Sequence, residues 1–174
     1  MTRWMTRTLV GVSLSLAALP SLAQDSTNRV ATKTDWSVFT EDKPSKECWG
    51  VSSPKESVNS RDGAAVSVKR SDILLFITFR PGQAAGEVSF TGGYAFAKDS
   101  KVDVEIAGQK FQMFSDGEWA WTSGPADDAK LLAALKAGAE ASLTAHSAKG
   151  TQTKDTFSLK GFSAAMDEAA SRCK

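Results

Sequence analysis

The side chains best suited to acid–base chemistry in this 174-residue chain are one histidine and one pair of carboxylates. His146 is the only histidine, and Asp103 and Glu105 stand two residues apart in an alternating segment. Two carboxylates on one strand face can act as acid and base or bind a cation, although such a pair is more often a solvated strand face. No Gly-x-Ser-x-Gly nucleophile elbow accompanies His146, which favours a solvent-facing histidine. We therefore expect a protein without enzyme activity.

The remaining candidates for chemistry are two cysteines and a glycine pair. Cys48 and Cys173 have no closely spaced histidine, so they do not form the ligand set of a zinc site. Gly92-Gly93 lacks the lysine and helix of a phosphate-binding loop and instead predicts a turn or a close backbone approach. We expect no cofactor and no metal. In an exported chain two cysteines favour a disulfide, which here would close a loop of about 125 residues and contribute roughly 4–5 kcal/mol.

The N-terminus predicts export. A basic start precedes an apolar run from Leu9 to Leu19, and small residues follow up to Ala23. This pattern is typical of a signal peptide over residues 1–23, cleaved before Gln24. The apolar run is shorter than the roughly 20 residues of a membrane-spanning helix. We therefore expect a periplasmic or secreted protein without a membrane span.

The mature chain has the size and charge of one ordinary domain. Removing residues 1–23 leaves 174 − 23 = 151 residues, and we expect a flexible polar leader over 24–34 and a single domain over 35–174. The signal peptide carries two of the 21 basic residues, so 19 basic face 20 acidic groups and the net charge is −1. This balance argues against a nucleic-acid partner.

Alternation of apolar and polar residues predicts that most of the mature chain is β-strand. Strands are expected over residues 36–40, 46–52, 87–91, 102–106, 110–114, 118–122 and 139–147. Turns at Gly108 and Asp116-Gly117 join three of them into a meander. The run Ile73–Phe79 has no polar face and predicts a strand buried on both sides, whereas Pro54–Ala64 predicts a polar, turn-rich loop.

Two helices complete the predicted fold. One lies over residues 125–138, and the other follows Gly161 from Ser163, its expected N-cap, to Cys173. The only disulfide partner of Cys173 is Cys48, in the opening hairpin. We predict a mainly β protein of eight to ten strands, an antiparallel β-sandwich or partly closed barrel with two short helices, the C-terminal one tethered by the disulfide.

Large aromatic residues supply the candidate interaction surface. Trp119 and Trp121 point to the same face of one predicted strand, while Trp36 and Trp49 lie in the opening hairpin. Such side chains usually fill a core, but two or more exposed together would form a platform for a protein partner or a sugar. The candidate surface residues are Trp119, Trp121 and Tyr94.

Several segments, taken in order, also carry a family resemblance over nearly the whole mature chain. They are Trp36, Cys48-Trp49-Gly50-Val51-Ser52, Gly93-Tyr94, the 104–114 hairpin, Ala120-Trp121, the helix ending at Gly138 and the segment 156–165 closing on Cys173. This pattern resembles the invasion-associated locus B family of exported bacterial proteins. The resemblance implies an exported protein with no established enzyme activity, linked to host-cell entry in pathogenic relatives.

Two functions are therefore compatible with the sequence. The first is a non-enzymatic envelope protein that binds an envelope or host protein through a sheet face or loop rim. The alternative is a periplasmic small-ligand-binding protein or hydrolase with a pocket near His146 and the Asp103/Glu105 pair. A pocket lined by convergent polar groups would favour the alternative.

Overall fold

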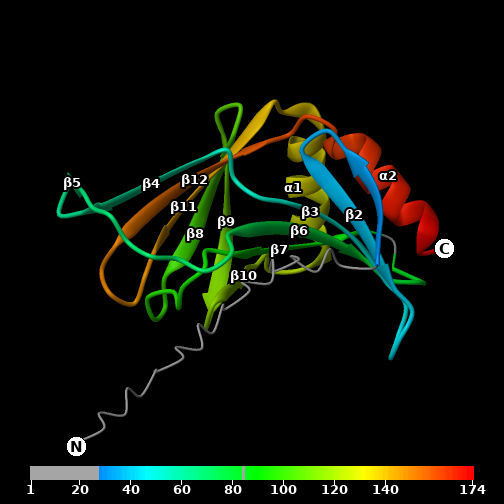
Figure 1. Ribbon diagram of the computed structural model, residues 1–174, viewed down its shortest axis with the longest axis horizontal. Coiled ribbons are helices and arrows are strands. Elements are labelled where there is room, and N and C mark those ends of the chain that lie inside the picture. The colour runs from blue at the N-terminus through cyan, green and yellow to red at the C-terminus, as the bar shows by residue number, and fades with distance from the viewer. Residues whose placement is uncertain (1–27, 84) are drawn as a thin grey trace, which may run out of the picture.

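A single antiparallel sheet and two helices make up the fold, which confirms the mainly β prediction (Figure 1). The computed structural model describes residues 28–83 and 85–174, and the predicted signal peptide lies outside them. The sheet order is β1-β2-β3-β6-β7-β10-β9-β8-β11-β12-β4-β5. The strands are β1 (Arg29–Lys33), β2 (Trp36–Glu41), β3 (Glu47–Ser52), β4 (Glu56–Arg61), β5 (Ala64–Ala65), β6 (Leu74–Phe79), β7 (Glu87–Thr91), β8 (Lys101–Ile106), β9 (Gln109–Asp116), β10 (Trp119–Trp121), β11 (Glu140–His146) and β12 (Gln152–Ser158), and the helices are α1 (Pro125–Ala137) and α2 (Phe162–Arg172).

The sheet curls until distant parts of its inner face touch. Strands β7 and β12 are separated by β10, β9, β8 and β11 in the sheet, yet the rings of Phe90 and Phe157 meet edge to face at 6.1 Å. At another crossing, Nε1 of Trp36 donates a hydrogen bond of 3.0 Å to the carbonyl oxygen of Ser158. The sheet is not closed, so the result is a sandwich-like fold with the core between its two halves.

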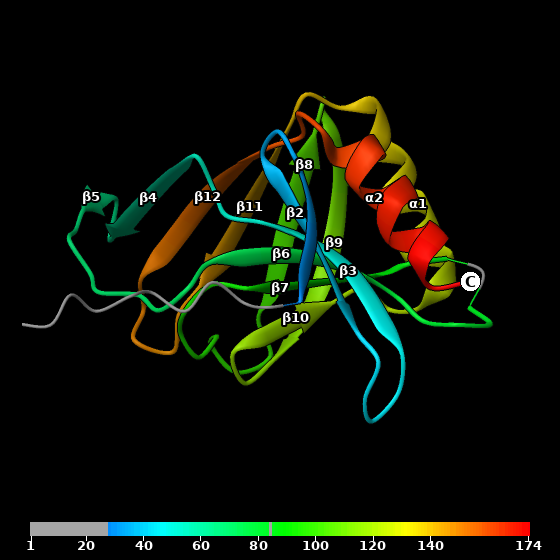
Figure 2. The same cartoon turned by 45° about the vertical axis from the view of Figure 1, so that its right-hand side comes forward.

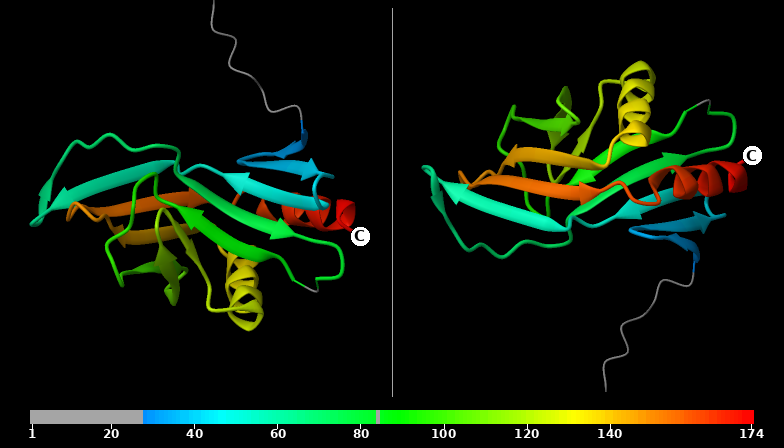
Figure 3. Two further views of the ribbon diagram at one scale, coloured as in Figure 1. Left: turned by 90° about the horizontal axis from the view of Figure 1, so that it is seen from below. Right: turned by 90° about the horizontal axis from the view of Figure 1, so that it is seen from above.

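Both helices cover the inner face, where they lie side by side (Figure 2). Helix α2 packs on β2 and β3, and the ring of Phe162 meets that of Trp36 edge to face at 4.9 Å. Gly50 of β3 leaves the space that the Met166 side chain occupies. The other end of the sheet, with β4 and β5, lies away from α2 (Figure 3).

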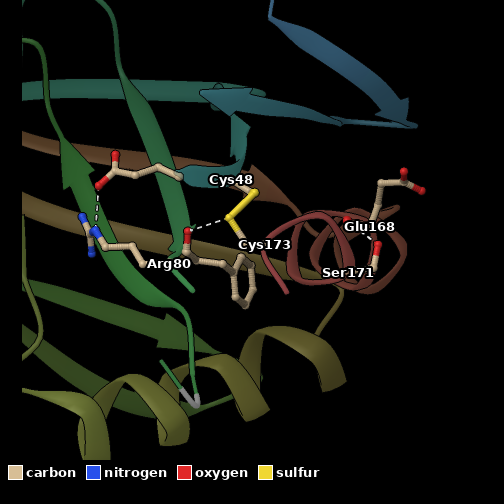
Figure 4. Close-up of a disulfide and its surroundings, with 7 residues drawn as sticks. Cys48, Arg80, Glu168, Ser171 and Cys173 are labelled. Carbon is tan, nitrogen blue, oxygen red and sulfur yellow. Dashed lines mark hydrogen bonds and ion pairs between the residues drawn. A yellow bond between two sulfur atoms is a disulfide. The ribbon is translucent and has the colours of Figure 1, made fainter. Parts of the chain in front are cut away.

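The predicted disulfide is present and tethers the C-terminal helix. Cys48 lies in β3 and Cys173 directly after α2, 125 positions apart in sequence (Figure 4). Both residues are buried, and Sγ of Cys173 lies 3.3 Å from the carbonyl oxygen of Phe79. Phe79 is the register partner of Cys48 across β3 and β6. The disulfide therefore attaches the C-terminal end of α2 to the paired strands β3 and β6 at Cys48 and Phe79.

The N-terminus of α2 differs from the prediction. Gly161, and not Ser163, is the N-cap residue, and no side chain caps the helix. Gly161 has φ +85°, and a Cβ atom there would collide with the backbone of Lys33. Only glycine combines this left-handed conformation with so close an approach of another strand.

Three strand predictions were also wrong. Residues 29–33, expected in the flexible leader, form β1 because they pair along β2 and cover the core with Val30. Glu56–Arg61, expected as a loop, forms β4 because its backbone pairs with β12, although its side chains apart from Val58 are polar. Only alternate residues of β6 are fully buried, since the other side of this apolar run forms the outer face of the sheet. The described strands consequently number twelve, not eight to ten.

Candidate functional site

Six aromatic side chains gather on the outer face of the sheet, opposite the helices. They are Phe39, Trp49, Phe76, Phe114, Trp119 and Trp121, and together they form what we call the aromatic face. Each follows or precedes a buried inner-face residue, so strand alternation directs its ring outward. These rings come from strands β2, β3, β6, β9 and β10, and the sheet order brings them together.

Strand register places the rings in neighbouring rows. Phe39 lies directly opposite Trp49, and their rings stack with centroids 5.6 Å apart. In the next row Phe76 and Trp121 both pair with Ser89 of β7, and Trp121 pairs with Phe114 of β9. The small side chain of Ser89 thus lies within this row, between Phe76 and Trp121.

The second set of rings continues along β10. The indole of Trp119 lies 6.5 Å from that of Trp121 and 5.7 Å from the ring of Phe76, measured between centroids. Phe114 and Trp121 are 5.7 Å apart. The rings form one continuous apolar surface from β6 to β9.

This surface is most exposed to solvent at its β10 and β9 end. Phe114 retains 47% and Trp119 39% of its accessible area, while Trp49, Phe76 and Trp121 are half-buried. Contiguous exposed aromatic residues are rare on monomeric proteins and typically mark interaction sites. A shallow hollow of about 370 Å³ lies among Trp49, Phe76, Trp119 and Trp121. A second hollow, of about 900 Å³, shares Trp121 and extends to the start of α1.

Charged side chains border the aromatic face at the end of β3 and β6. Nε of Arg80 donates to Oε1 of Glu47 at 2.6 Å, and its Nη1 donates to Oε2 of Glu87 at 3.3 Å. The hydrogen bond to Glu47 raises the pKa of Arg80 above its usual value, with a smaller contribution from the charge of Glu87. Arg80 therefore remains a cation held between two carboxylates. Glu47 projects from the outer face of β3, whereas the next residue, Cys48 of the disulfide, projects from the inner face.

The other half of the outer face is polar and contains the predicted carboxylates. Asp103 and Glu105 are exposed on β8 and line a recess of about 550 Å³ with Lys110, Gln112, Ser142, Thr144 and Lys154. Nε2 of Gln112 donates to Oδ1 of Asp103 at 2.9 Å. His146 is exposed on β11 but does not line this recess. The structure therefore brings the two carboxylates together and leaves His146 apart from them.

Tyr94 is not part of the aromatic face. Its hydroxyl lies 2.5 Å from Oγ1 of Thr153 on the inner face, and its ring stands edge to face with Phe96. The guanidinium of Arg70 lies over the Tyr94 ring, 5.0 Å from its centroid. The expectation that Tyr94 joins Trp119 and Trp121 was therefore wrong, because the chain turns at Gly92-Gly93 toward the inside of the curled sheet.

The turn before Tyr94 depends on a close backbone approach, as the glycine pair predicted. Gly93 has φ +74°, and a Cβ atom there would lie 2.5 Å from the carbonyl oxygen of Ser71. Ser71 also donates its backbone N–H to the carbonyl oxygen of Gly93 at 3.0 Å. Glycine is required at this position by both its backbone conformation and the lack of space.

Comparison with known proteins places the chain in a family. Residues 36–170 match the sequence profile described as "Invasion associated locus B (IalB) protein". The chain belongs to the IalB family. The crystal structure of invasion associated protein B from Bartonella henselae is similar to it, with a TM-score of 0.56 and 17% identity over 82% of this chain and 96% of that chain. No curated protein sequence matches.

The IalB segment contains the whole aromatic face and ends before Cys173. Among the described residues, no helix is long and apolar enough to cross a membrane. Sequence reasoning singled out Trp119 and Trp121 in this IalB protein but missed Phe39, Phe76, Phe114 and Arg80. Phe76 alternates with Leu75 and Ile77, which are buried. Strand alternation could therefore have predicted that the Phe76 ring points outward.

Proposed function

We propose that this IalB protein is an exported, non-enzymatic envelope protein that binds a protein partner through its aromatic face. The observation that carries this proposal is the exposed, contiguous set of rings around Trp119 and Trp121. Exposed tryptophans carry a large share of the binding free energy in many protein interfaces. Burying one such ring contributes a few kcal/mol, by about 25 cal/mol per Å² of apolar area.

Export is supported by two independent features. The disulfide between Cys48 and Cys173 is typical of oxidising compartments outside the cytoplasm. The basic and apolar N-terminus is typical of a signal peptide, which we propose is cleaved between Ala23 and Gln24. The intact mass of the exported protein tests this proposal, because retention of residues 1–23 would contradict it.

A capture experiment with matched variants tests the interaction. Mature protein is immobilised, envelope extract is passed over it, and bound proteins are compared between the parent and Trp119→Ala/Trp121→Ala. Val58→Ala is the matched control, since Val58 is an equally exposed apolar residue (47%) at the far end of the sheet on β4. We expect the double variant to lose a partner that the control retains. Equal capture by all three proteins would contradict the proposal.

The polar recess supports a second candidate, a small-ligand-binding protein or hydrolase. Its supporting observation is that Asp103 and Glu105 converge with Lys110 and Lys154 around one hollow. If this recess carries the function, Asp103→Asn/Glu105→Gln abolishes the activity of the folded protein. His146→Ala is expected to have no effect on partner binding through the aromatic face.

A further inference from the structure

We propose that the aromatic face recognises arginine side chains on an extended basic segment of its protein partner. This inference rests on the proposed function and adds the chemistry of the partner. It draws on the accessible tryptophan rings, on the carboxylates that line the hollow beside them and on the shape of the adjoining hollows.

Among the described residues, no cation–π contact involves the ring of Trp119 or Trp121. Within the part of the chain that the structure describes, these two indoles contact each other, Phe76 and Phe114. The described cation–π contact lies elsewhere, between Arg70 and Tyr94. An indole face attracts a guanidinium more strongly than a phenyl ring does. The exposed ring of Trp119 and the half-buried ring of Trp121 are therefore accessible to a cation from a partner.

Carboxylates border the hollow among the tryptophan rings. Glu47 and Glu87 line this hollow, and Asp116 pairs directly with Trp119 across β9 and β10. The cation that lines the hollow is Arg80, whereas Lys101, Lys110 and Lys130 line a separate hollow beside Phe114. A cationic side chain that enters the hollow at Trp119 therefore meets complementary charge.

Two of these carboxylates can accept a second guanidinium. Arg80 engages one oxygen of Glu47 and one oxygen of Glu87, which leaves each carboxylate a second oxygen. The Glu47 side chain is 37% exposed and that of Glu87 is 42% exposed. A planar guanidinium can stack on an indole while it donates to a neighbouring carboxylate, whereas a lysine ammonium is a strongly hydrated point charge. This combination favours arginine.

The shape of the site favours an extended segment. The hollow at Trp119 is shallow, and it continues into the larger hollow at the start of α1 through the shared residues Glu87 and Trp121. Both hollows are open to solvent, so their shape would not enclose a small ligand. A partner that lies along both can place an arginine near Glu87 and continue past Trp121 toward the start of α1.

Blocked peptides of alternating glycine and arginine test this inference on the mature, disulfide-bonded protein. In two control peptides, lysine or citrulline replaces arginine. Lysine keeps the positive charge without the planar group, and citrulline keeps a planar group without the charge. Binding is measured by tryptophan fluorescence and by calorimetry at low and physiological salt. We expect the arginine peptide to bind about fivefold more tightly than the lysine peptide, because only the planar guanidinium both stacks on an indole and donates to a neighbouring carboxylate, and citrulline to fail.

Variants then locate the binding. Trp119→Ala/Trp121→Ala and Glu87→Gln are each expected to weaken the arginine peptide about fivefold or more, and Val58→Ala to leave it unchanged. Equal binding of arginine and lysine peptides, unaffected by the tryptophan variant, would mean general charge attraction and overturn the inference. Failure of the arginine peptide, with quenching by a neutral oligosaccharide or self-association instead, would also overturn it. If the tryptophan variant still loses the captured partner in that case, the proposed function stands and only the arginine chemistry fails.

Discussion

Arg70 and Asp155 form a buried, bidentate ion pair between residues 85 positions apart. Nη2 donates to Oδ2 at 2.6 Å and Nη1 to Oδ1 at 2.8 Å, while the two side chains are 6% and 0% exposed. Nε of Arg70 also donates to the carbonyl oxygen of Gly92 at 2.8 Å, and Ser57 donates to Asp155 at 2.7 Å. The pair thus connects the segment before β6 with β7, β12 and β4.

Removing one partner of this pair is expected to destabilise the fold strongly. Asp155→Asn leaves the guanidinium of Arg70 buried without its counter-charge, which costs about 3–5 kcal/mol. For a domain of this size the melting temperature should fall by roughly 6–20 °C. Differential scanning calorimetry measures the change. The matched control is Asp127→Asn, whose partner Lys130 is 69% exposed and whose loss should cost less than about 1 kcal/mol. Similar melting temperatures for both variants would contradict this assignment.

Tyr94 should make stability depend on alkaline pH. Burial raises the pKa of the Tyr94 hydroxyl above its ordinary value of 10.0, an effect that the hydrogen bond with Thr153 partly offsets. As pH rises past 10.0, the unfolded chain releases this proton before the folded chain does. The stabilisation is therefore complete below that pH and is lost as pH rises toward the folded-state pKa.

The measurement is direct because Tyr94 is the only tyrosine in the sequence. Ultraviolet absorbance of tyrosinate should show a midpoint above 10.0 in the native protein and a lower midpoint in denaturant. Tyr94→Phe should remove this contribution to the alkaline loss of stability. A native midpoint at or below the denatured one would show that Tyr94 is not held as described.

The Cys48–Cys173 disulfide should contribute a large share of the stability. It closes a loop of 125 positions, for which the chain-entropy model gives about 4–5 kcal/mol. Helix α2 has 11 residues, too few to persist alone in water, so its order depends on packing and on this bond. Cys48→Ser/Cys173→Ser should lower the melting temperature by roughly 8–20 °C. A parent-like melting curve, or two titratable thiols in denatured, unreduced protein, would contradict this role.

Local sequence patterns predicted much of this fold. The alternation of Val102, Val104 and Ile106 with Asp103 and Glu105 gave β8 its two faces, and turn residues such as Asp116-Gly117 located the meander correctly. The cysteine count and the helical spacing after Gly161 predicted the tethered helix. In these cases neighbouring residues contain the whole signal.

Long-range strand order explains what the sequence could not predict. Strand β4 has a polar sequence, and it is a strand because its backbone pairs with β12 about 100 positions later. The aromatic face exists because β7 and β10 are adjacent, which brings Phe76 and Trp121 to either side of Ser89. Arg70 finds Asp155 only once the sheet has curled. No periodicity within one segment reports such pairings.

Site-specific photo-crosslinking in cells that export the protein tests the central proposal most directly. A photoreactive residue replaces Trp119 in one variant and Val58, on β4, in the other, and both proteins must export and melt like the parent. The account predicts a discrete crosslinked partner from position 119 and none from position 58, with the adduct at 119 lost when Trp121 and Phe114 are also changed to alanine. No adduct at 119, or the same adducts from both positions, would contradict an interaction through the aromatic face.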